Sequence, residues 1–380
     1  MRIRSLVLCC VCSLSACVAL GADWQIVASP NSGNRPNSLN AVAAVAENDV
    51  WAVGASSSSD SSSSRTLIEH WNGTGWSVVR SPNPGATFNV LTAVAVVSAN
   101  NVWAAGYSAN NTTYSTLVEH WNGTKWTVIP SPNGFNGAPQ LNFLSGIAVV
   151  SANDIWAVGS FFEDEDNTLT LHWNGSVWSV VPSPNGGLET NNGLSAVTAI
   201  AANDVWAVGS FQSEAVGAEA RTLTLHWNGT AWDIVPSAND GVEGNFLHGI
   251  AAIRSNDIWA VGRVENVDTL ALHWNGAAWS VVSTPAIADS GFADLRSGVA
   301  LSTDAVWTAG SFFQNTFSRD RTLTELWNGS AWSIVSSPNR GGSHNDLNAI
   351  AATPNGTLWA VGFQYNSAGV QRTLILQKLP

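Results

Sequence analysis

The sequence predicts an all-β fold of seven similar four-stranded units, and three observations support this prediction. A tryptophan recurs every 48 to 53 residues, at Trp51, Trp103, Trp156, Trp206, Trp259, Trp307 and Trp359. A second motif, Trp-Asn-Gly-x-x-Trp, has six copies, which begin at Trp71, Trp121, Trp173, Trp227, Trp274 and Trp327. The missing half-copy is divided between the chain ends: residues 23–31 resemble the segment after each second tryptophan, and 372–376 the segment before it.

Each unit is predicted to contain four short strands, which in the first unit are 39–45, 50–54, 66–71 and 76–79. These runs are rich in Val, Ile, Thr and Trp, and Asn-Asp or Asn-Gly turns separate them, which is typical of β-hairpins. No stretch shows the period and end caps of a helix. Seven four-stranded antiparallel units with a split last unit predict a seven-bladed β-propeller, whose N-terminal strand joins the C-terminal blade and closes the ring.

These repeats resemble those of exported bacterial seven-bladed β-propeller repeat proteins, and more distantly tectonin-type and kelch-type propellers. The resemblance covers residues 23–380, which are expected to form one domain. It implies the fold and leaves the activity open, because propellers host many unrelated functions. The paired glycines of a strict kelch repeat and the Asp-box of sialidases are absent, and the repeats are longer than is usual for tectonin. No site residues are therefore taken from the resemblance.

The first 22 residues are predicted to be an export signal. Two arginines precede an apolar run that is short for a membrane span. Cleavage after Ala22 would give a secreted protein. Alternatively, Leu14-Ser15-Ala16-Cys17 resembles a bacterial lipobox, in which Cys17 would be lipidated and would anchor an extracytoplasmic lipoprotein. Under either alternative the protein is expected to be exported, with a membrane contacted only through that anchor.

Composition excludes several kinds of site. All four cysteines lie in the leader, so residues 23–380 have no disulfide, thiolate nucleophile or cysteine metal site. The chain has 27 acidic and 15 basic residues, which argues against a nucleic-acid partner. The acidic segment 163–166 lacks the spaced pattern of a calcium loop and is expected to be a solvated loop. We expect no metal, no cofactor and a monomer.

Length variation predicts which face of the propeller is functional. The distance from the leucine that opens the first strand to the tryptophan of the second is 12 residues in every unit. In contrast, the interval between the second-strand and third-strand tryptophans ranges from 15 to 21 residues, and the interval that leads to the next unit from 15 to 18. Because antiparallel strands alternate in direction, both variable intervals reach the same face. Loops on a rigid scaffold often carry the binding groups, so this variable face is the predicted binding face.

Two sets of residues are candidates for ligand binding. The first is polar, follows each opening leucine and is expected to ring the mouth of the central channel: Asn40, Thr92, Ser145, Ser195, His248, Arg296 and Asn348. Within it, His248 and Arg296 are candidates for recognising an anionic group. The second set is aromatic and lies in the variable intervals: Tyr107, Phe162, Phe313 and Tyr365. The repeated tryptophans and the histidines before the third-strand tryptophan are expected to be structural.

The expected function is binding without catalysis on the variable face. The expected partner is a glycan or cell-surface polymer, or another exported protein. One alternative is a polysaccharide hydrolase or lyase at the channel mouth, with residues 163–166, Glu265, His248 and Arg296 as the first suspects. No nucleophile with a neighbouring base is evident, so no catalytic residue is assigned. The other alternative is a passive surface scaffold.

Overall fold

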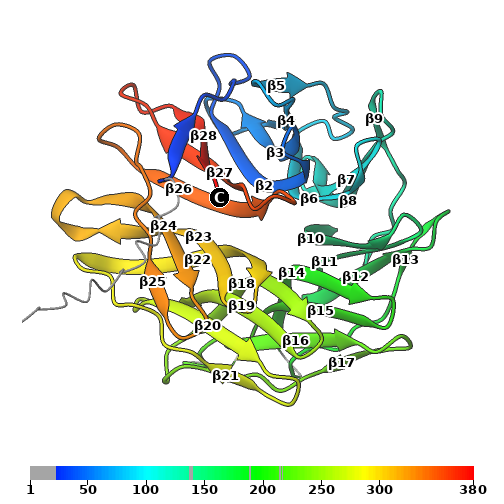
Figure 1. Cartoon of the computed structure of the whole chain (residues 1–380). Coiled ribbons are helices and arrows are strands. Elements are labelled where there is room, and N and C mark those ends of the chain that lie inside the picture. Colours follow the sequence, from blue (N-terminus) through cyan, green and yellow to red (C-terminus); the bar gives the residue numbers. More distant parts are fainter. Residues whose placement is uncertain (1–22, 137–139, 188–189, 214, 216) are drawn as a thin grey trace, which may run out of the picture.

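The computed structural model describes residues 23–136, 140–187, 190–213, 215 and 217–380 (Figure 1). It confirms the predicted fold, because the strands form seven four-stranded antiparallel sheets arranged as the blades of a propeller. The helical segment of the described residues is a single 3-10 turn, η1 (Asn315–Phe317). Each strand is short and rich in β-branched or aromatic residues, and each blade buries its faces only by stacking on its neighbours.

Blades 1 to 4 follow one another along the chain. Blade 1 consists of β2 (Asn37–Ala46), β3 (Asp49–Ser57), β4 (Ser64–Trp71) and β5 (Trp76–Val79). Blade 2 consists of β6 (Phe88–Ser98), β7 (Asn101–Asn110), β8 (Thr113–Trp121) and β9 (Trp126–Val128). Blade 3 consists of β10 (Leu141–Ser151), β11 (Asp154–Glu163), β12 (Glu165–Trp173) and β13 (Trp178–Val180). Blade 4 consists of β14 (Thr190–Ala201), β15 (Asp204–Ser213), β16 (Arg221–Trp227) and β17 (Trp232–Ile234).

The remaining three blades complete the ring. Blade 5 consists of β18 (Asn245–Arg254), β19 (Asp257–Val264), β20 (Thr269–Trp274) and β21 (Trp279–Val281). Blade 6 consists of β22 (Ser290–Ser302), β23 (Ala305–Gln314), β24 (Arg319–Trp327) and β25 (Trp332–Ile334). Blade 7 consists of β26 (Asn345–Ala352), β27 (Leu358–Tyr365), β28 (Gln371–Lys378) and β1 (Gln25–Val27).

The two ends of the chain share blade 7, as the split repeat predicts. Strand β1 is the outermost strand and pairs antiparallel with β28, with Ile26 opposite Leu376. Trp24 packs beside Leu374 in the core between blades 6 and 7. Further contacts join the loop after β1 to the start of β28, because the backbone N–H of Thr373 donates to Asn31 Oδ1 at 3.1 Å. This pairing covers the outer edge of β28, which would otherwise be exposed.

The tryptophans pack blade against blade. The ring of Trp156 in blade 3 lies 4.8 Å from that of Trp227 and 5.2 Å from that of Trp232, both in blade 4. The same arrangement recurs around the ring, and it crosses the junction of first and last blades between Trp359 and Trp71. The tryptophans of the second strand of each blade are almost fully buried. The repeated tryptophans are therefore core residues, as predicted.

A shared acceptor orients the tryptophan and histidine of blades 1, 2 and 4. Asp204 Oδ1 accepts hydrogen bonds from Trp206 Nε1 at 2.8 Å and lies 2.9 Å from His226 Nε2. His226 also stacks on Trp206. The histidines are structural, as expected. The aspartate of this Asn-Asp pair therefore bonds side chains of β15 and β16.

The strands extend further toward the variable face than the sequence indicates. The segment 163–166, expected to be a loop, forms a hairpin in which Glu163 pairs with Glu165 across Asp164. Asp164 has a φ of +63°, which this tight turn requires. The backbone of this hairpin is paired except at the turn residue Asp164. The run of charged residues in the sequence did not indicate the hairpin.

The predicted export signal and Cys17 lie outside the described residues, so their roles stay predictions. The described residues contain no helix of the length and apolarity needed to cross a bilayer. In the same part of the chain, no three His, Asp or Glu side chains come together as they would to hold a metal ion.

Candidate functional site

A β-bulge re-aims one side chain of the innermost strand in every blade. In blade 4, pairing of β14 with β15 skips one residue between Leu194 and Ala196, so Ser195 is the bulged residue. The glycine opposite makes this possible: a Cβ on Gly209 would lie 1.9 Å from the Gly193 carbonyl oxygen. Equivalent bulges occur in the other six blades. Bulges commonly redirect a side chain in this way.

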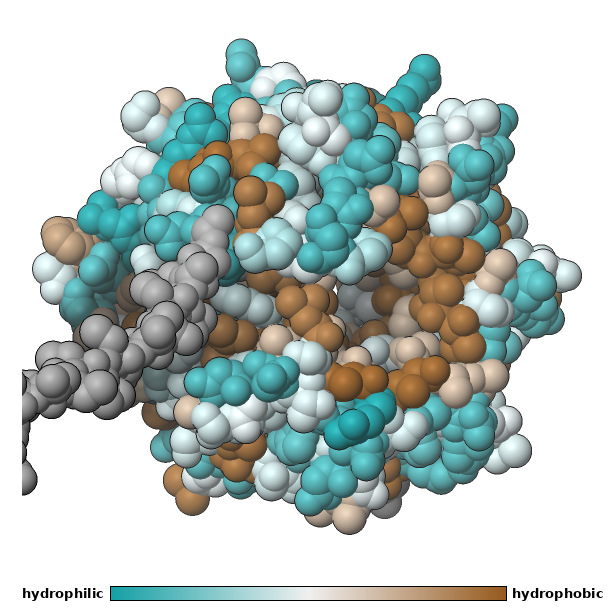
Figure 2. Space-filling view, viewed as in Figure 1, coloured by the Kyte–Doolittle hydropathy of each residue, from teal (hydrophilic) through white to brown (hydrophobic). Residues whose placement is uncertain are grey.

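The seven bulged residues together form the central ring: Asn40, Thr92, Ser145, Ser195, His248, Arg296 and Asn348. All seven line one cavity of about 180 Å³ on the propeller axis. In Figure 2 a hollow near the middle of the molecule is bordered by hydrophobic side chains. The predicted ring therefore converges on the channel. Its cavity is smaller than the ~300–1,000 Å³ of most ligand pockets.

Several ring members connect adjacent blades. Asn40 Nδ2 donates to the Leu91 carbonyl at 2.9 Å, and Thr92 Oγ1 donates to the Leu144 carbonyl at 2.6 Å. Asn348 Nδ2 likewise donates to the Leu39 carbonyl at 2.8 Å, across the junction of blades 7 and 1. Each bond therefore gives a backbone carbonyl beside the bulge of the adjacent blade a side-chain partner. A polar residue at these positions is explained by blade-to-blade bonding.

The charged side of the ring is an internally neutralised cluster. Arg296 Nη2 lies 3.2 Å from Asp346 Oδ1, Arg296 Nε lies 3.4 Å from Asp294 Oδ2, and Arg296 Nη1 donates to Asn348. His248 lies 3.5 Å from Asp294, and burial lowers the pKa of His248. One guanidinium therefore faces two carboxylates. The expectation that His248 and Arg296 receive an anionic group does not fit this geometry, because the cation is already occupied.

The Arg296→Met variant is expected to lose about 2 kcal/mol of unfolding free energy at pH 7. Burial raises the pKa of Asp346, and Arg296 opposes that shift. Without Arg296, an ionised Asp346 destabilises the folded state. This destabilisation grows as the pH rises above the ordinary pKa of an aspartate and shrinks as the pH falls toward 4. Urea denaturation at pH 4 and pH 7 measures the difference. Arg254→Met is the control, because Arg254 is 61% exposed in its ion pair with Asp257; an equal loss at both pH values would contradict the electrostatic explanation.

The four candidate aromatic residues lie on four different blades and do not form one cluster. Tyr107 packs 5.1 Å from Phe143 and 5.9 Å from Tyr114, and burial raises its pKa. Phe313 stacks on Phe292 within blade 6. Phe162, in β11, is half-buried. Of the four, Tyr365 lines the cavity that is described next.

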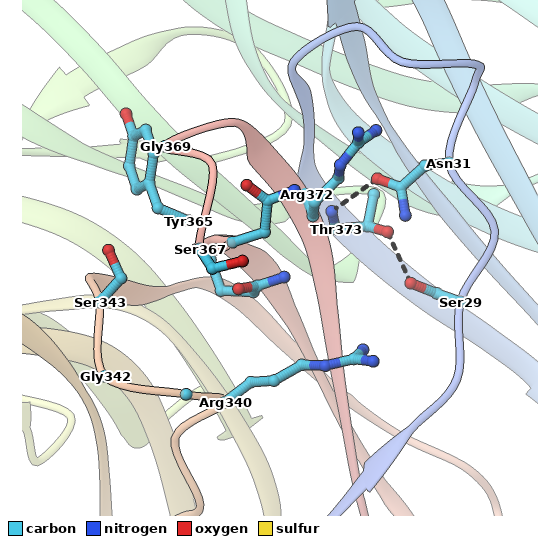
Figure 3. A pocket seen from close by; sticks show the side chains of 13 residues that line it. Ser29, Asn31, Arg340, Gly342, Ser343, Tyr365, Ser367, Gly369, Arg372 and Thr373 are labelled. Atoms are coloured by element: carbon cyan, nitrogen blue, oxygen red, sulfur yellow. Dashed lines mark hydrogen bonds between the residues drawn. The ribbon is translucent and has the colours of Figure 1, made fainter.

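A larger cavity, here called the blade-7 pocket, lies on the variable face. Its walls are the loop before β26, the hairpin between β27 and β28, the start of β28 and the loop after β1 (Figure 3). Its volume is about 870 Å³, within the usual range for ligand sites. Its polar and aromatic lining residues are Ser29, Asn31, Arg340, Ser343, Gln364, Tyr365, Asn366, Ser367, Arg372 and Thr373.

Hydrogen bonds fix one wall of the blade-7 pocket. Ser29 Oγ lies 2.6 Å from Thr373 Oγ1, and Thr373 Oγ1 also donates to the Pro30 carbonyl at 3.1 Å. Arg372 Nη1 donates to the Gly33 carbonyl at 3.0 Å. On the opposite side, the ring of Tyr365 lies edge-to-face with His344 at 5.9 Å. The pocket therefore has a rigid polar wall and an aromatic wall (Figure 3).

Most of this pocket is not predicted from the sequence. Arg340 is a cation within a variable segment of an acidic chain, and that position was the available signal. Arg372 occupies the same repeat position as Arg221, so nothing in the sequence sets it apart. Ser29 and Asn31 belong to a Ser-Pro-Asn triplet, which recurs in other blades and is typical of a turn. In the structure the triplet asparagine accepts a hydrogen bond from the first residues of the third strand, as Asn185 does from the Thr168 N–H at 3.0 Å.

No model of a protein family matches the chain, and no curated protein matches its sequence. Several solved structures share the fold. A protein of unknown function from Dyadobacter fermentans aligns with a TM-score of 0.58 and 10% identity, over 94% of this chain and 99% of that one. The extracellular domain of a putative hybrid two-component system from B. thetaiotaomicron aligns with a TM-score of 0.54 and 8% identity, over 93% of this chain and 39% of that one.

A third similar structure is a Trypanosoma rangeli sialidase in complex with 2,3-difluorosialic acid. It aligns with a TM-score of 0.51 and 11% identity, over 93% of this chain and 58% of that one. At such identities the likeness concerns the fold alone. The comparisons agree with the propeller architecture, and the site must be judged from its own residues.

Proposed function

We propose that this protein is an exported carbohydrate-binding propeller that holds its ligand in the blade-7 pocket without chemical turnover. The observation that carries the proposal is the lining of that pocket. Hydroxyl and amide side chains, which both donate and accept hydrogen bonds, surround a cavity of about 870 Å³ beside the ring of Tyr365. Such side chains suit a ligand that carries many hydroxyl groups, and the aromatic face suits the apolar face of a sugar ring.

Binding is favoured over hydrolysis because of where the carboxylates lie. No Asp or Glu is among the residues that line the blade-7 pocket. At the channel, Asp294 and Asp346 share the guanidinium of Arg296 beside a cavity of about 180 Å³. A glycosidase needs one carboxylic acid and one free carboxylate on either side of the scissile bond. Neither cavity offers that pair.

The Tyr365→Ala variant is expected to bind saccharide about tenfold more weakly than the wild type, because it loses the aromatic wall of the pocket. A glycan array identifies a bound saccharide, and calorimetry compares the variants. Phe162→Ala is the matched control: Phe162 holds the same repeat position in blade 3 and does not line the pocket.

Product analysis in the same experiments tests the absence of turnover. Released sugar or an unsaturated product would replace the proposal with the hydrolase or lyase alternative. If no saccharide binds, the proposal is wrong, and an exported protein partner becomes the better explanation.

A further inference from the structure

The charges of this chain are distributed unevenly around the ring. Residues 136–318, which form blades 3 to 5 and most of the first half of blade 6, contain 18 Asp and Glu and four Arg. Residues 23–135 and 319–380, which form the rest of the ring, contain nine acidic and nine basic residues. The blade-7 pocket lies in this second sector, whose formal charges balance. An anion that approaches the molecule therefore meets less repulsion there than over blades 3 to 5.

Buried carboxyl groups make the sector more positive than its composition indicates. Glu69, Glu119 and Glu325 belong to it, and each is fully buried. Burial raises the pKa of each to about 8, so they are mostly protonated at neutral pH. Three of the nine acidic residues thus contribute little negative charge.

Two guanidinium groups line the pocket, and neither has a carboxylate partner among the residues that the structure describes. Arg372 is held by backbone carbonyls, that of Gly33 at 3.0 Å and that of Arg35 at 3.4 Å. Carbonyl groups orient a guanidinium without cancelling its charge. Arg340 is exposed, and within the described part of the chain its side chain has no hydrogen bond or ion pair. In Figure 3 both guanidinium groups lie on the side of the pocket formed by Ser29 and Asn31, across from Tyr365.

A third arginine supports the wall of the pocket. Arg319 donates from Nη1 to the Gly342 carbonyl, and its guanidinium lies 4.5 Å from the centre of the Phe317 ring. Phe317 is 57% exposed and lines a second cavity of about 630 Å³, which shares Gly341 with the blade-7 pocket. The two cavities therefore adjoin. Together they offer Arg340 and Arg372 at one end, and Arg321 and the exposed ring of Phe317 at the other.

We propose that the blade-7 pocket selects anionic saccharides, in which a uronate carboxylate or a sulfate ester is bound by Arg340 and Arg372 and the following sugar extends past Gly341 toward Phe317. This inference rests on the proposed carbohydrate-binding function and adds the class of sugar. Guanidinium groups bind carboxylate and sulfate oxygens through charge-assisted hydrogen bonds, and pre-oriented groups lose less entropy on binding.

Calorimetry with three matched tetrasaccharides tests the inference on the full-length protein. They are a uronate-containing tetrasaccharide, its carboxyl-reduced neutral counterpart and a sulfated one. The wild type is expected to bind at least one acidic form at least tenfold more tightly than the neutral form, with an affinity that falls as salt rises. The uronate and sulfate arms show which anion is preferred.

Paired variants locate the effect. Arg340→Gln with Arg372→Gln is expected to remove the preference for the acidic sugar. Arg80→Gln with Arg221→Gln makes the same change in net charge and is expected to preserve it; Arg221 holds the repeat position of Arg372 in blade 4. Thermal melting shows whether each variant is folded. If Arg372→Gln unfolded the protein, Arg340→Gln and added salt would still report the preference.

The possible results separate the two proposals. Equal or tighter binding of the neutral tetrasaccharide would overturn the anionic preference and leave carbohydrate binding standing. Loss of preference in the control pair would overturn the assignment to Arg340 and Arg372. Failure to bind any saccharide, on the tetrasaccharides or on the array, would overturn both.

Discussion

The substitutions Glu69→Leu, Glu119→Leu and Glu325→Leu are expected together to raise the free energy of unfolding by several kcal/mol at pH 8. Each glutamate is fully buried on the third strand of its blade. Both carboxyl oxygens of Glu69 and Glu119 lack a hydrogen-bond partner within the described structure. The four other blades carry a fully buried leucine at the same register position, namely Leu171, Leu225, Leu272 and Leu376. The core therefore already accepts leucine there.

The size of the effect depends on pH. Burial raises the pKa of each glutamate from 4.5 to about 8. When the pKa of an acid is higher in the folded state than in the unfolded state, the acid destabilises the fold at any pH above its unfolded-state pKa. This destabilisation increases with pH until the pH exceeds the folded-state pKa. The penalty is roughly 3 kcal/mol per residue at pH 7, at ~1.4 kcal/mol per pKa unit. It is small near pH 4.5, where the folded state is protonated and the unfolded state is about half protonated.

Urea denaturation of wild type and variants at pH 5 and pH 8 measures this penalty. The wild type is expected to lose stability between the two pH values, and the triple variant is expected to lose much less. Glu243→Leu, at an exposed position, serves as the control and is expected to change stability by less than about 0.5 kcal/mol. A leucine variant less stable than wild type at pH 8 would show that these carboxyl groups have a favourable role in the fold.

Gly209→Ala is expected to destabilise the protein by at least about 4 kcal/mol, or to prevent folding. Its new Cβ would lie 1.9 Å from the Gly193 carbonyl oxygen and 2.9 Å from Leu194 Cα, both backbone atoms. Neither can move without opening the bulge that aims Ser195 at the axis. The strain is steric, since the new methyl group would overlap atoms of the neighbouring strand.

Gly193→Ala provides a matched control in the same blade. A Cβ on Gly193 meets no atom within 4 Å, although Gly193 pairs next to the bulge. This variant is expected to fold with stability close to that of the wild type. Thermal melting and far-ultraviolet circular dichroism compare the two. If both alanine variants melted at the wild-type temperature, the bulge would not require a glycine at position 209.

The sequence predicts the architecture well because tryptophan spacing is a local and repeated signal. Constant intervals between Trp71 and Trp76, and between Leu39 and Trp51, correspond to hairpins of fixed length. The division of one repeat between the chain ends predicts the pairing of β1 with β28. The bulges are not predicted, because a period-2 pattern does not indicate a skipped residue. The glycine three positions after each second-strand tryptophan was the sequence feature that marks the bulges.

The sites were harder to predict than the fold. The central ring does converge, as its repeat position predicts. Its hydrogen bonds, such as that from Asn40 to the Leu91 carbonyl, depend on three-dimensional geometry that residue spacing in the sequence does not specify. The buried Glu119 looks like an ordinary polar residue in the sequence, because only comparison with Leu171 and Leu225 shows that the position is internal. The blade-7 pocket joins residues near 30, 340 and 370, which no local motif relates.

The contribution of both chain ends to blade 7 affects when the protein becomes competent during its production. Strands from blades 1 to 6 each find their partners within about 50 residues, whereas Ile26 waits for Leu376. The chain must therefore be synthesised at least as far as Leu376 before the last sheet can form. Ser29 and Asn31 reach Thr373 only at that stage. A chain cut short before β28 would lack the wall of the blade-7 pocket that Arg372 and Thr373 form, so a truncated product is not expected to bind the proposed ligand.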